Sequence, residues 1–356
     1  MILYAGSYTE IIEDDFGGHG DGIYCFDFNA DNGSLNLRNV YAATNPSYLC
    51  IPTGEYLYTQ TEIFEVNKPR VLSFRIDPYD FSLHLMNEQH IPGGLPCHIN
   101  YSKKNNCIMV ACYETGNIMI YPVAPDGTLL PLAKVIQHDG TGINKLRQER
   151  AHAHAVIIDE KFSNIIVTDL GIDKIMVYHI ETGKENIEVK LNQVITLPPG
   201  SGPRHMVVHA ETQFAFVLNE LTAAVTVMRY RDGNFELLYT FQTLPDDFNA
   251  TPGAAAIRIS ANGKFLYISE RSHNCITVLR FDAGNETLEV IGRHETMGKT
   301  PRDINLDPTG NWLLAANQDS DSIAIFKVDK DTGMISPGYL AENIKSPVCL
   351  EWLQVK

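Results

Sequence analysis

Short runs of alternating apolar and polar residues recur along the whole chain, and helical periodicity is nearly absent. Alternation with a period of two predicts half-buried β-strands. The clearest unit predicts four strands, at 203–210, 214–219, 224–230 and 235–242. The turn before the last strand contains Asp232, Gly233 and Asn234, which tolerate the positive φ angles of tight hairpins. The pattern therefore predicts an antiparallel, four-stranded unit.

This unit recurs along the chain at a regular interval. Related strands are predicted at 256–260, 265–269, 275–281, 312–316 and 322–328. The first strand of each unit opens near one of seven Pro or Ala residues: Pro46, Pro96, Ala153, Pro203, Ala254, Pro301 and Pro347. These residues are 46 to 57 positions apart, and a strand-rich repeat of about 40 to 50 residues is typical of a β-propeller with one four-stranded blade per repeat. We therefore expect an all-β chain that forms a single seven-bladed propeller domain over residues 1–356.

The two ends of the chain are expected to share one blade. The last repeat has only its first strand, 347–353, whereas the start of the chain supplies strands at 2–8, 22–28 and 35–42. Together these segments would close the ring and remove open sheet edges. Two polar insertions, 10–21 and 140–150, interrupt the repeat, and we expect both to line the rim of a mouth of the ring.

Charge and cysteine usage limit the kinds of partner and compartment. With a net charge of −15 and a pI near 5.2, the chain lacks the basic surface that nucleic acid or an anionic membrane would need. Seven cysteines without a Cys-x-x-Cys pair indicate reduced thiols. The opening residues do not resemble a signal peptide, and no apolar run approaches the roughly 18 residues of a membrane span. We expect a cytoplasmic monomer or weak homo-oligomer without nucleic-acid or membrane partners.

Basic and polar side chains recur at one phase of the repeat. In a propeller the first strand of each blade lines the central channel, and its start lies beside the end of the antiparallel second strand. The starts of the first strands carry His98, His152, His154, Arg204, His205 and Arg302. The ends of the second strands carry Asp169, Asn219, Glu220, Glu270, Arg271, Asn317 and Gln318. A mouth rich in arginine and histidine, within an acidic protein, predicts a site for a small anion.

Five stretches carry a family resemblance, and they occur in order along essentially the whole chain. They are Gln148 to Val156, Asp169 to Asp173, Gly202 to His205 with Asn219 and Glu220, Ser269 to Asn274, and Thr300 to Asp303 with Ala316 to Gln318. The set resembles the lactonase-type seven-bladed propellers, which include cycloisomerase-like 6-phosphogluconolactonases and carboxy-muconate lactonising enzymes. The resemblance implies functional roles for His154 (or His152), Arg204, Glu220 and Arg271. Glu270 stands where the family has Asn, and we expect this extra carboxylate to weaken the grip of Arg271 on an anion.

The resemblance implies metal-independent hydrolysis of a phosphorylated sugar lactone, most simply 6-phospho-glucono-1,5-lactone, a reaction of the pentose phosphate pathway. Hydrolysis needs a base for water, a stabiliser for the oxyanion and an anchor for the phosphate. Either Glu220 or His154 is the expected base, and His154 is favoured because Arg204 would lower the pKa of Glu220. Arg204 is the expected oxyanion stabiliser, and Arg271 and Arg302 are the expected anchors. Further contacts to this small anionic substrate are expected from His152, His205 and Gln318, with no cofactor or metal.

The same side chains also have purely structural interpretations. His152 and His154 are two apart on a strand and so point the same way, and they could be hydrogen-bonded channel residues or a metal pair. Arg204 and Arg302 could join neighbouring blades through a carboxylate such as Asp303.

Two other functions fit the same fold. A muconate-type lactonising cycloisomerase would use the arginines to bind a dicarboxylate. A non-catalytic protein-binding propeller would need only structural ion pairs, such as one between Arg204 and Glu220. The Trp-Asp repeat signature of many such scaffolds is missing, because Trp312 and Trp352 are the only tryptophans and neither precedes Asp.

Overall fold

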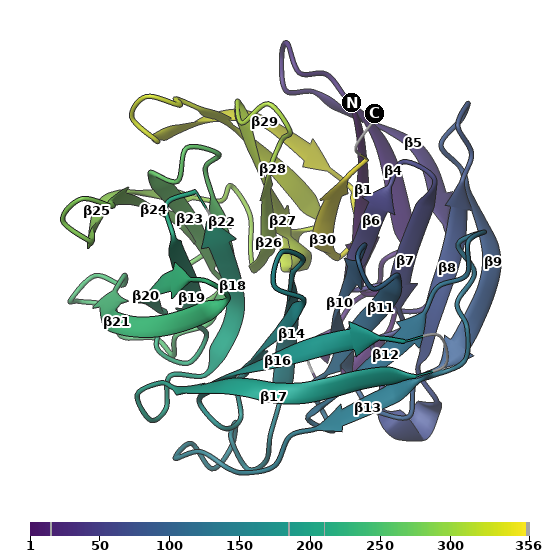
Figure 1. The fold of residues 1–356 in the computed structure, drawn as a ribbon. Helices are drawn as coiled ribbons and strands as arrows, with labels where there is room; N and C mark the ends of the chain where they lie inside the picture. Colours follow the sequence, from purple (N-terminus) through teal and green to yellow (C-terminus); the bar gives the residue numbers. More distant parts are fainter. Residues whose placement is uncertain (15, 184–185, 210, 354–356) are drawn as a thin grey trace.

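Seven antiparallel sheets of four strands each surround a central axis as the blades of a β-propeller (Figure 1). The computed structural model describes residues 1–14, 16–183, 186–209 and 211–353. Two short 3-10 helices, η1 (Glu65–Asn67) and η2 (Gln318–Ser320), and a small sheet of β2 (Ile11–Glu13) and β3 (Phe16–Gly17) lie outside the blades. No helix in these ranges is long and apolar enough to cross a membrane. The all-β, seven-bladed prediction is confirmed.

Within each blade the strands follow the order A to D, with the A strands of adjacent blades in contact around the axis. The A strands are β6 (Leu49–Thr53), β10 (Pro96–Ser102), β14 (Ala153–Asp159), β18 (Pro203–His209), β22 (Ala254–Ile259), β26 (Pro301–Leu306) and β30 (Pro347–Trp352). The B strands are β7 (Tyr56–Gln60), β11 (Cys107–Cys112), β15 (Asn164–Asp169), β19 (Phe214–Asn219), β23 (Phe265–Glu270), β27 (Trp312–Asn317) and β1 (Ile2–Ser7). The C strands are β8 (Arg70–Ile76), β12 (Asn117–Pro122), β16 (Lys174–Thr182), β20 (Ala224–Arg231), β24 (Cys275–Asp282), β28 (Ser322–Val328) and β4 (Ile23–Phe28). The D strands are β9 (Leu83–His90), β13 (Lys134–Gln137), β17 (Ile187–Thr196), β21 (Asn234–Gln242), β25 (Thr287–Glu295), β29 (Ile335–Glu342) and β5 (Leu35–Tyr41).

The first and last strands of the chain share a blade, in the order β30-β1-β4-β5. Ala5 of β1 pairs with Leu350 of β30 on one side and with Tyr24 of β4 on the other. Because both edges of β1 are hydrogen-bonded, the start of the chain lies inside a sheet rather than at its edge. The predicted ring closure is confirmed.

Apolar side chains between adjacent blades form the core. The B strands β1, β11, β15, β19, β23 and β27 are buried at every residue. In one layer, Phe216 and Leu218 of β19 pack with Ile257 of β22 and Leu266 of β23. Full burial of each such side chain stabilises the fold by about 1.5–3 kcal/mol. The blades therefore form a packed frame that fixes the ends of the A and B strands.

The A strands begin where the repeat predicts. Six begin at the Pro or Ala residue identified in the sequence, and only β6 begins later, at Leu49. In all six of these strands, the pairing with the B strand slips directly after that first residue, so that a residue is left without a partner. Four of these bulged residues are Cys97, His154, Arg204 and Arg302. Bulges of this kind redirect a side chain, often beside a functional site.

Candidate active site

A cavity of about 340 Å³ lies at the mouth where the A strands begin. Its volume is within the range of about 300–1,000 Å³ that suits small organic ligands. The insertion 10–21 contributes two residues to its wall and the insertion 140–150 contributes one, so both insertions border this mouth, as expected. The lining residues are Glu13, Phe16, Glu62, Leu95, Cys97, Tyr113, Arg147, His154, Glu220, Arg271 and Arg302.

The bulges explain which A-strand side chains reach this cavity. Cys97, His154 and Arg302 are bulged residues and line it. Pairing resumes one residue later, where His205 faces Leu218 across the sheet. His205 then lines a smaller space deeper in the channel. The bulge therefore lets Cys97, His154 and Arg302 reach the cavity, whereas the bulged Arg204 lines only the smaller space.

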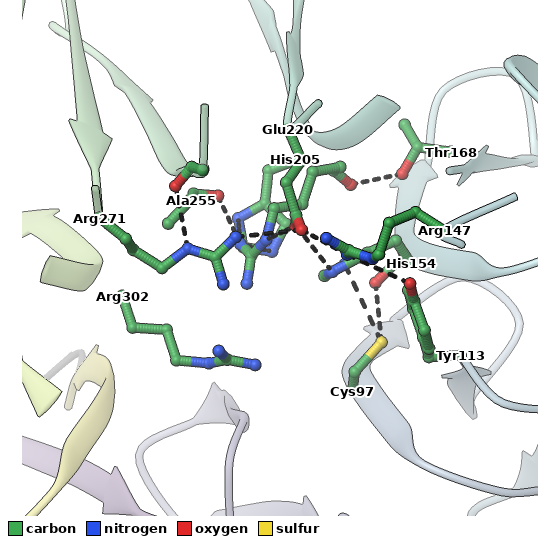
Figure 2. A network of polar contacts seen from close by, with 12 residues as sticks. Cys97, Tyr113, Arg147, His154, Thr168, His205, Glu220, Ala255, Arg271 and Arg302 are labelled. Atoms are coloured by element: carbon green, nitrogen blue, oxygen red, sulfur yellow. Dashed lines mark hydrogen bonds and ion pairs between the residues drawn. The ribbon is translucent and has the colours of Figure 1, made fainter. Parts of the chain in front are cut away.

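Glu220 is the centre of the polar network, directly after the end of β19 (Figure 2). Its carboxylate accepts a bond from Arg147 Nη2 at 2.6 Å and from Arg204 Nε at 3.0 Å, and lies 3.1 Å from Arg271 Nη2. Burial alone would raise the pKa of Glu220, but Arg271, Arg147 and Arg204 outweigh it and hold that pKa well below its usual value. The group is therefore an ionised carboxylate and a weak base.

His154 is buried beside Glu220. Its Nε2 lies 3.8 Å from Glu220 Oε2, and its Nδ1 lies 3.9 Å from Cys97 Sγ. Burial, reinforced by the charge of Arg204, holds the pKa of His154 well below 6.5. The imidazole is therefore neutral at physiological pH and can donate one hydrogen bond and accept another.

Arg204 lies behind the cavity wall rather than in it. Besides Glu220, its guanidinium contacts the carbonyl of Ala255 and the ring of His205, where Nη1 and Nε2 are 3.1 Å apart. Burial lowers the pKa of Arg204 to about 10, so it stays charged at neutral pH. Because Arg204 is directed at Glu220, it acts on the cavity through that carboxylate.

Arg271 lines the cavity and is held at two points. Its Nε donates to the Gly253 carbonyl at 2.9 Å, and its Nη2 faces Glu220. Among the described residues Glu270 forms no ion pair with Arg271, and its expected effect on anion binding stays a prediction. The Glu270 carboxylate instead accepts the backbone N–H groups of Gly253 and His273, which orders the loops on either side.

Arg302 reaches the cavity from β26. Its Nη2 donates to Tyr8 Oη at 2.7 Å, and its guanidinium lies 5.0 Å from the Tyr8 ring centroid and 5.3 Å from that of Phe16. Asp303 does not join it to the next blade, because Asp303 pairs with Arg258 at 2.8 Å. Within the described residues no carboxylate forms a direct ion pair with Arg302, so its charge is available to an anion.

His152 does not line the cavity. It precedes β14, and the bulge at His154 breaks the alternation that would have aligned the two rings. The His152 ring contacts the Tyr113 carbonyl at 2.8 Å and Glu149 at 3.1 Å. Nowhere in the described ranges do three His, Cys, Asp or Glu side chains come together in a metal-binding group.

Two other predicted contacts lie next to the cavity but not in its wall. The His205 ring is buried in the channel, 5.6 Å from the centroid of His98 and 5.7 Å from that of His154. Gln318 donates from Nε2 to the Gly17 carbonyl at 3.0 Å. Gln318 therefore fastens the insertion 10–21 rather than contacting the cavity itself.

Comparison with known proteins places this chain in a family. A family model described as a lactonase, seven-bladed β-propeller matches residues 2–352. The chain belongs to this lactonase family. The 6-phosphogluconolactonase of Bacillus subtilis (strain 168) is 29% identical over 355 residues, which cover 99% of this chain and 98% of that protein. The 6-phosphogluconolactonase of Formosa agariphila is 31% identical over 94% of each chain. In the structure of the Pseudomonas aeruginosa periplasmic gluconolactonase, 98% of each chain superposes with a TM-score of 0.88 at 28% identity.

Sequence reasoning did not single out four polar residues of this lactonase cavity, among them Glu13, which lies in an insertion and has no repeat position. Tyr113 follows β11 at the position where Glu220 follows β19, so the repeat itself could have identified it. Arg147 lies in an insertion and has no repeat position. Glu62 follows β7, but nine residues separate β7 from β8, so counting back from the C strand passes over it.

Proposed function

We propose that this lactonase hydrolyses a phosphorylated sugar lactone, with 6-phospho-glucono-1,5-lactone as its substrate. The observation that carries the proposal is the cavity that Arg271, Arg302 and Arg147 line around the ionised Glu220. Clustered arginines in an otherwise acidic chain favour an anionic ligand. The name 6-phosphogluconolactonase of two full-length relatives supports the choice of lactone.

The arginines divide the binding work in this proposal. Arg302 anchors the phosphate, because it lines the cavity without a carboxylate partner among the described residues. Arg271 stabilises the oxyanion, because Gly253 and Glu220 fix its guanidinium before the substrate arrives. Arg204 holds Glu220 from behind and is a positioning residue. The neutral His154 hydrogen-bonds the lactone.

A pH-stat assay tests the function. Purified protein is mixed with freshly prepared 6-phosphoglucono-1,5-lactone or with unphosphorylated glucono-1,5-lactone, each with and without a chelator. We expect acid release well above the spontaneous rate, a higher kcat/KM for the phosphorylated lactone because only it can bind Arg302, and no change with the chelator.

Three results would contradict parts of the proposal. Acid release at the spontaneous rate with both lactones would refute the proposed hydrolysis of these lactones. A preference for the unphosphorylated lactone would contradict the proposed recognition of a phosphate group. It would favour gluconolactone, the substrate in the name of the Pseudomonas relative. Turnover of a muconate-type acid, measured in parallel by its ultraviolet absorbance, would favour the cycloisomerase instead.

A further inference from the structure

A second buried carboxyl group lies in the same cavity as Glu220. Glu62 is 3% exposed and lines the cavity together with His154, Arg271 and Arg302. It also lines the smaller space behind, next to Arg204. The cavity therefore has two acidic side chains in its buried wall, and they come from different blades.

The backbone of Glu62 is fixed, and its carboxyl group has the hydroxyl groups of Ser47 and Tyr8 as hydrogen-bond partners. Its N–H donates to the Asn45 carbonyl at 3.0 Å, and Asn45 Nδ2 donates to the Glu62 carbonyl at 3.1 Å. Three arginines surround the carboxylate of Glu220, whereas no Lys, Arg or His among the described residues forms an ion pair with that of Glu62. Glu62 therefore lacks the arginine partners of Glu220, and its carboxyl group lines the cavity where a ligand or water can reach it.

The two environments shift the pKa values of Glu62 and Glu220 in opposite directions. Burial raises the pKa of Glu62, and the charge of Arg302 only partly opposes this. The pKa of Glu220 is instead held well below its usual value. Two carboxyl groups in one cavity with separated pKa values are the arrangement that acid–base enzymes use. The other charged or titratable groups around Glu62 belong to the two spaces that it lines. They are Tyr8, Tyr48, Cys97, Arg204, His205, Arg302 and Asp303 beside it or in the smaller space, and Glu13, Tyr113, Arg147, His154 and Arg271 around the cavity.

We propose that Glu62, rather than His154 or Glu220, is the general base that activates water in this cavity. The assignment rests on the proposed lactonase function. His154 is a poor alternative because the surrounding arginines and its burial disfavour its protonated form. Glu220 is a poor alternative because its lone pairs already accept from arginines.

The reaction balances with one water molecule. The Glu62 carboxylate takes one proton from the water, whose oxygen bonds to the lactone carbonyl carbon while the carbonyl electrons move to the oxyanion beside Arg271. The tetrahedral intermediate then collapses, the bond from the carbonyl carbon to the ring oxygen breaks, and that oxygen takes the proton from Glu62. The product is the hydroxy acid, and Glu62 is again a carboxylate.

The test is the pH profile of Glu62→Gln. Gln keeps the backbone contacts with Asn45 but cannot take a proton. We expect kcat/KM for 6-phosphoglucono-1,5-lactone to fall by about 10²- to 10⁴-fold. The parent profile should fall on the acidic side with an apparent pKa above the usual value for glutamate, because Glu62 must be ionised to act. That limb should disappear in Glu62→Gln and remain in Glu62→Asp.

The matched control is Glu55→Gln, an exposed carboxyl in the turn between β6 and β7 of the same blade. It should keep the parent rate and profile, and thermal melting should show that all variants are folded. A folded Glu62→Gln with the parent rate or with the acidic limb intact would overturn the assignment. A parent protein without any lactone hydrolysis would instead refute the proposed function, so the two failures are distinguishable.

Discussion

At the scale of single residues, several side chains of the mouth come from one position of the A strands. In five blades the bulged residue of the A strand is Cys97, His154, Arg204, Arg302 or Val348, and its backbone does not pair with the B strand. The strand pairing on either side is the same whatever side chain stands there. This position can therefore carry a thiol, an imidazole or a guanidinium without a change in the blade, which separates the chemistry from the fold.

Glu220 shows the opposite case, a residue that serves both chemistry and stability. Glu220→Ala removes the carboxylate shared by Arg147, Arg204 and Arg271, and leaves Arg204 buried without this ion-pair partner. We expect the free energy of unfolding to fall by about 3–5 kcal/mol in urea titrations, because an uncompensated charge stays buried.

The control for this prediction is Glu236→Ala. Glu236 pairs with Arg229 at 2.6 Å, but its side chain is 67% exposed. Loss of an exposed pair should change the stability by less than about 1 kcal/mol. Equal losses for the two variants would contradict the view that the Glu220 network stabilises the fold.

At the scale of elements, the blades and the two insertions together form the wall of the cavity. The hairpin of β2 and β3 brings Phe16 against Arg302, and Gln318 of η2 fastens it at Gly17. The insertion 140–150 carries Arg147 to Glu220, 73 residues along the chain. The strands thus supply the floor of the site and the insertions supply part of its wall.

Gly17→Ala tests the role of the hairpin. Gly17 has a φ of +131°, and an added Cβ would lie 2.4 Å from the Glu10 carbonyl oxygen. The hairpin must then shift, since this backbone strain amounts to about 1–3 kcal/mol. We expect a severalfold higher KM for the phosphorylated lactone, because Phe16 leaves Arg302, with the melting temperature little changed.

Gly284→Ala is the matched control, because Gly284 lies in an exposed turn and has no positive φ. It should leave KM unchanged. If Gly17→Ala also left KM unchanged, the hairpin would have no part in binding.

At the scale of the whole molecule, ring closure holds the site together. The cavity takes side chains from several blades, so its geometry depends on a complete ring. The last strand, β30, supplies Leu350 and Trp352 to the core and covers one edge of β1.

A chain that stops at Ser346 tests this closure. It lacks β30, exposes the edge of β1 and opens the core cluster around Leu350. We expect loss of cooperative unfolding in urea and aggregation in gel filtration. Leu350→Ala is the milder comparison and should retain a cooperative transition weakened by about 2–5 kcal/mol. Cooperative unfolding of the shortened chain at the parent midpoint would show that closure is dispensable.

Much of the architecture could be predicted from local patterns. Strand β19 was predicted at 214–219 and is found there, and the A strand at 301 begins at Pro301. These elements follow from alternation and turn residues, which are properties of neighbouring positions. The common orientation of His152 and His154 was not predicted correctly, because a bulge at His154 breaks the alternation. A bulge depends on how one strand is aligned with another, which neighbouring positions in the sequence do not show.

The sequence by itself determined the strands, their repeat, the shared terminal blade and the presence of basic side chains at one mouth. Only the tertiary structure decided which of those side chains meet. In the structure, Arg147 contacts Glu220 and Arg204 lies behind the cavity wall. Glu62 lines the cavity without a cationic partner among the described residues. The physical reason is that burial and charge at a site depend on residues far apart in the chain, whereas a strand depends mainly on its neighbours in sequence.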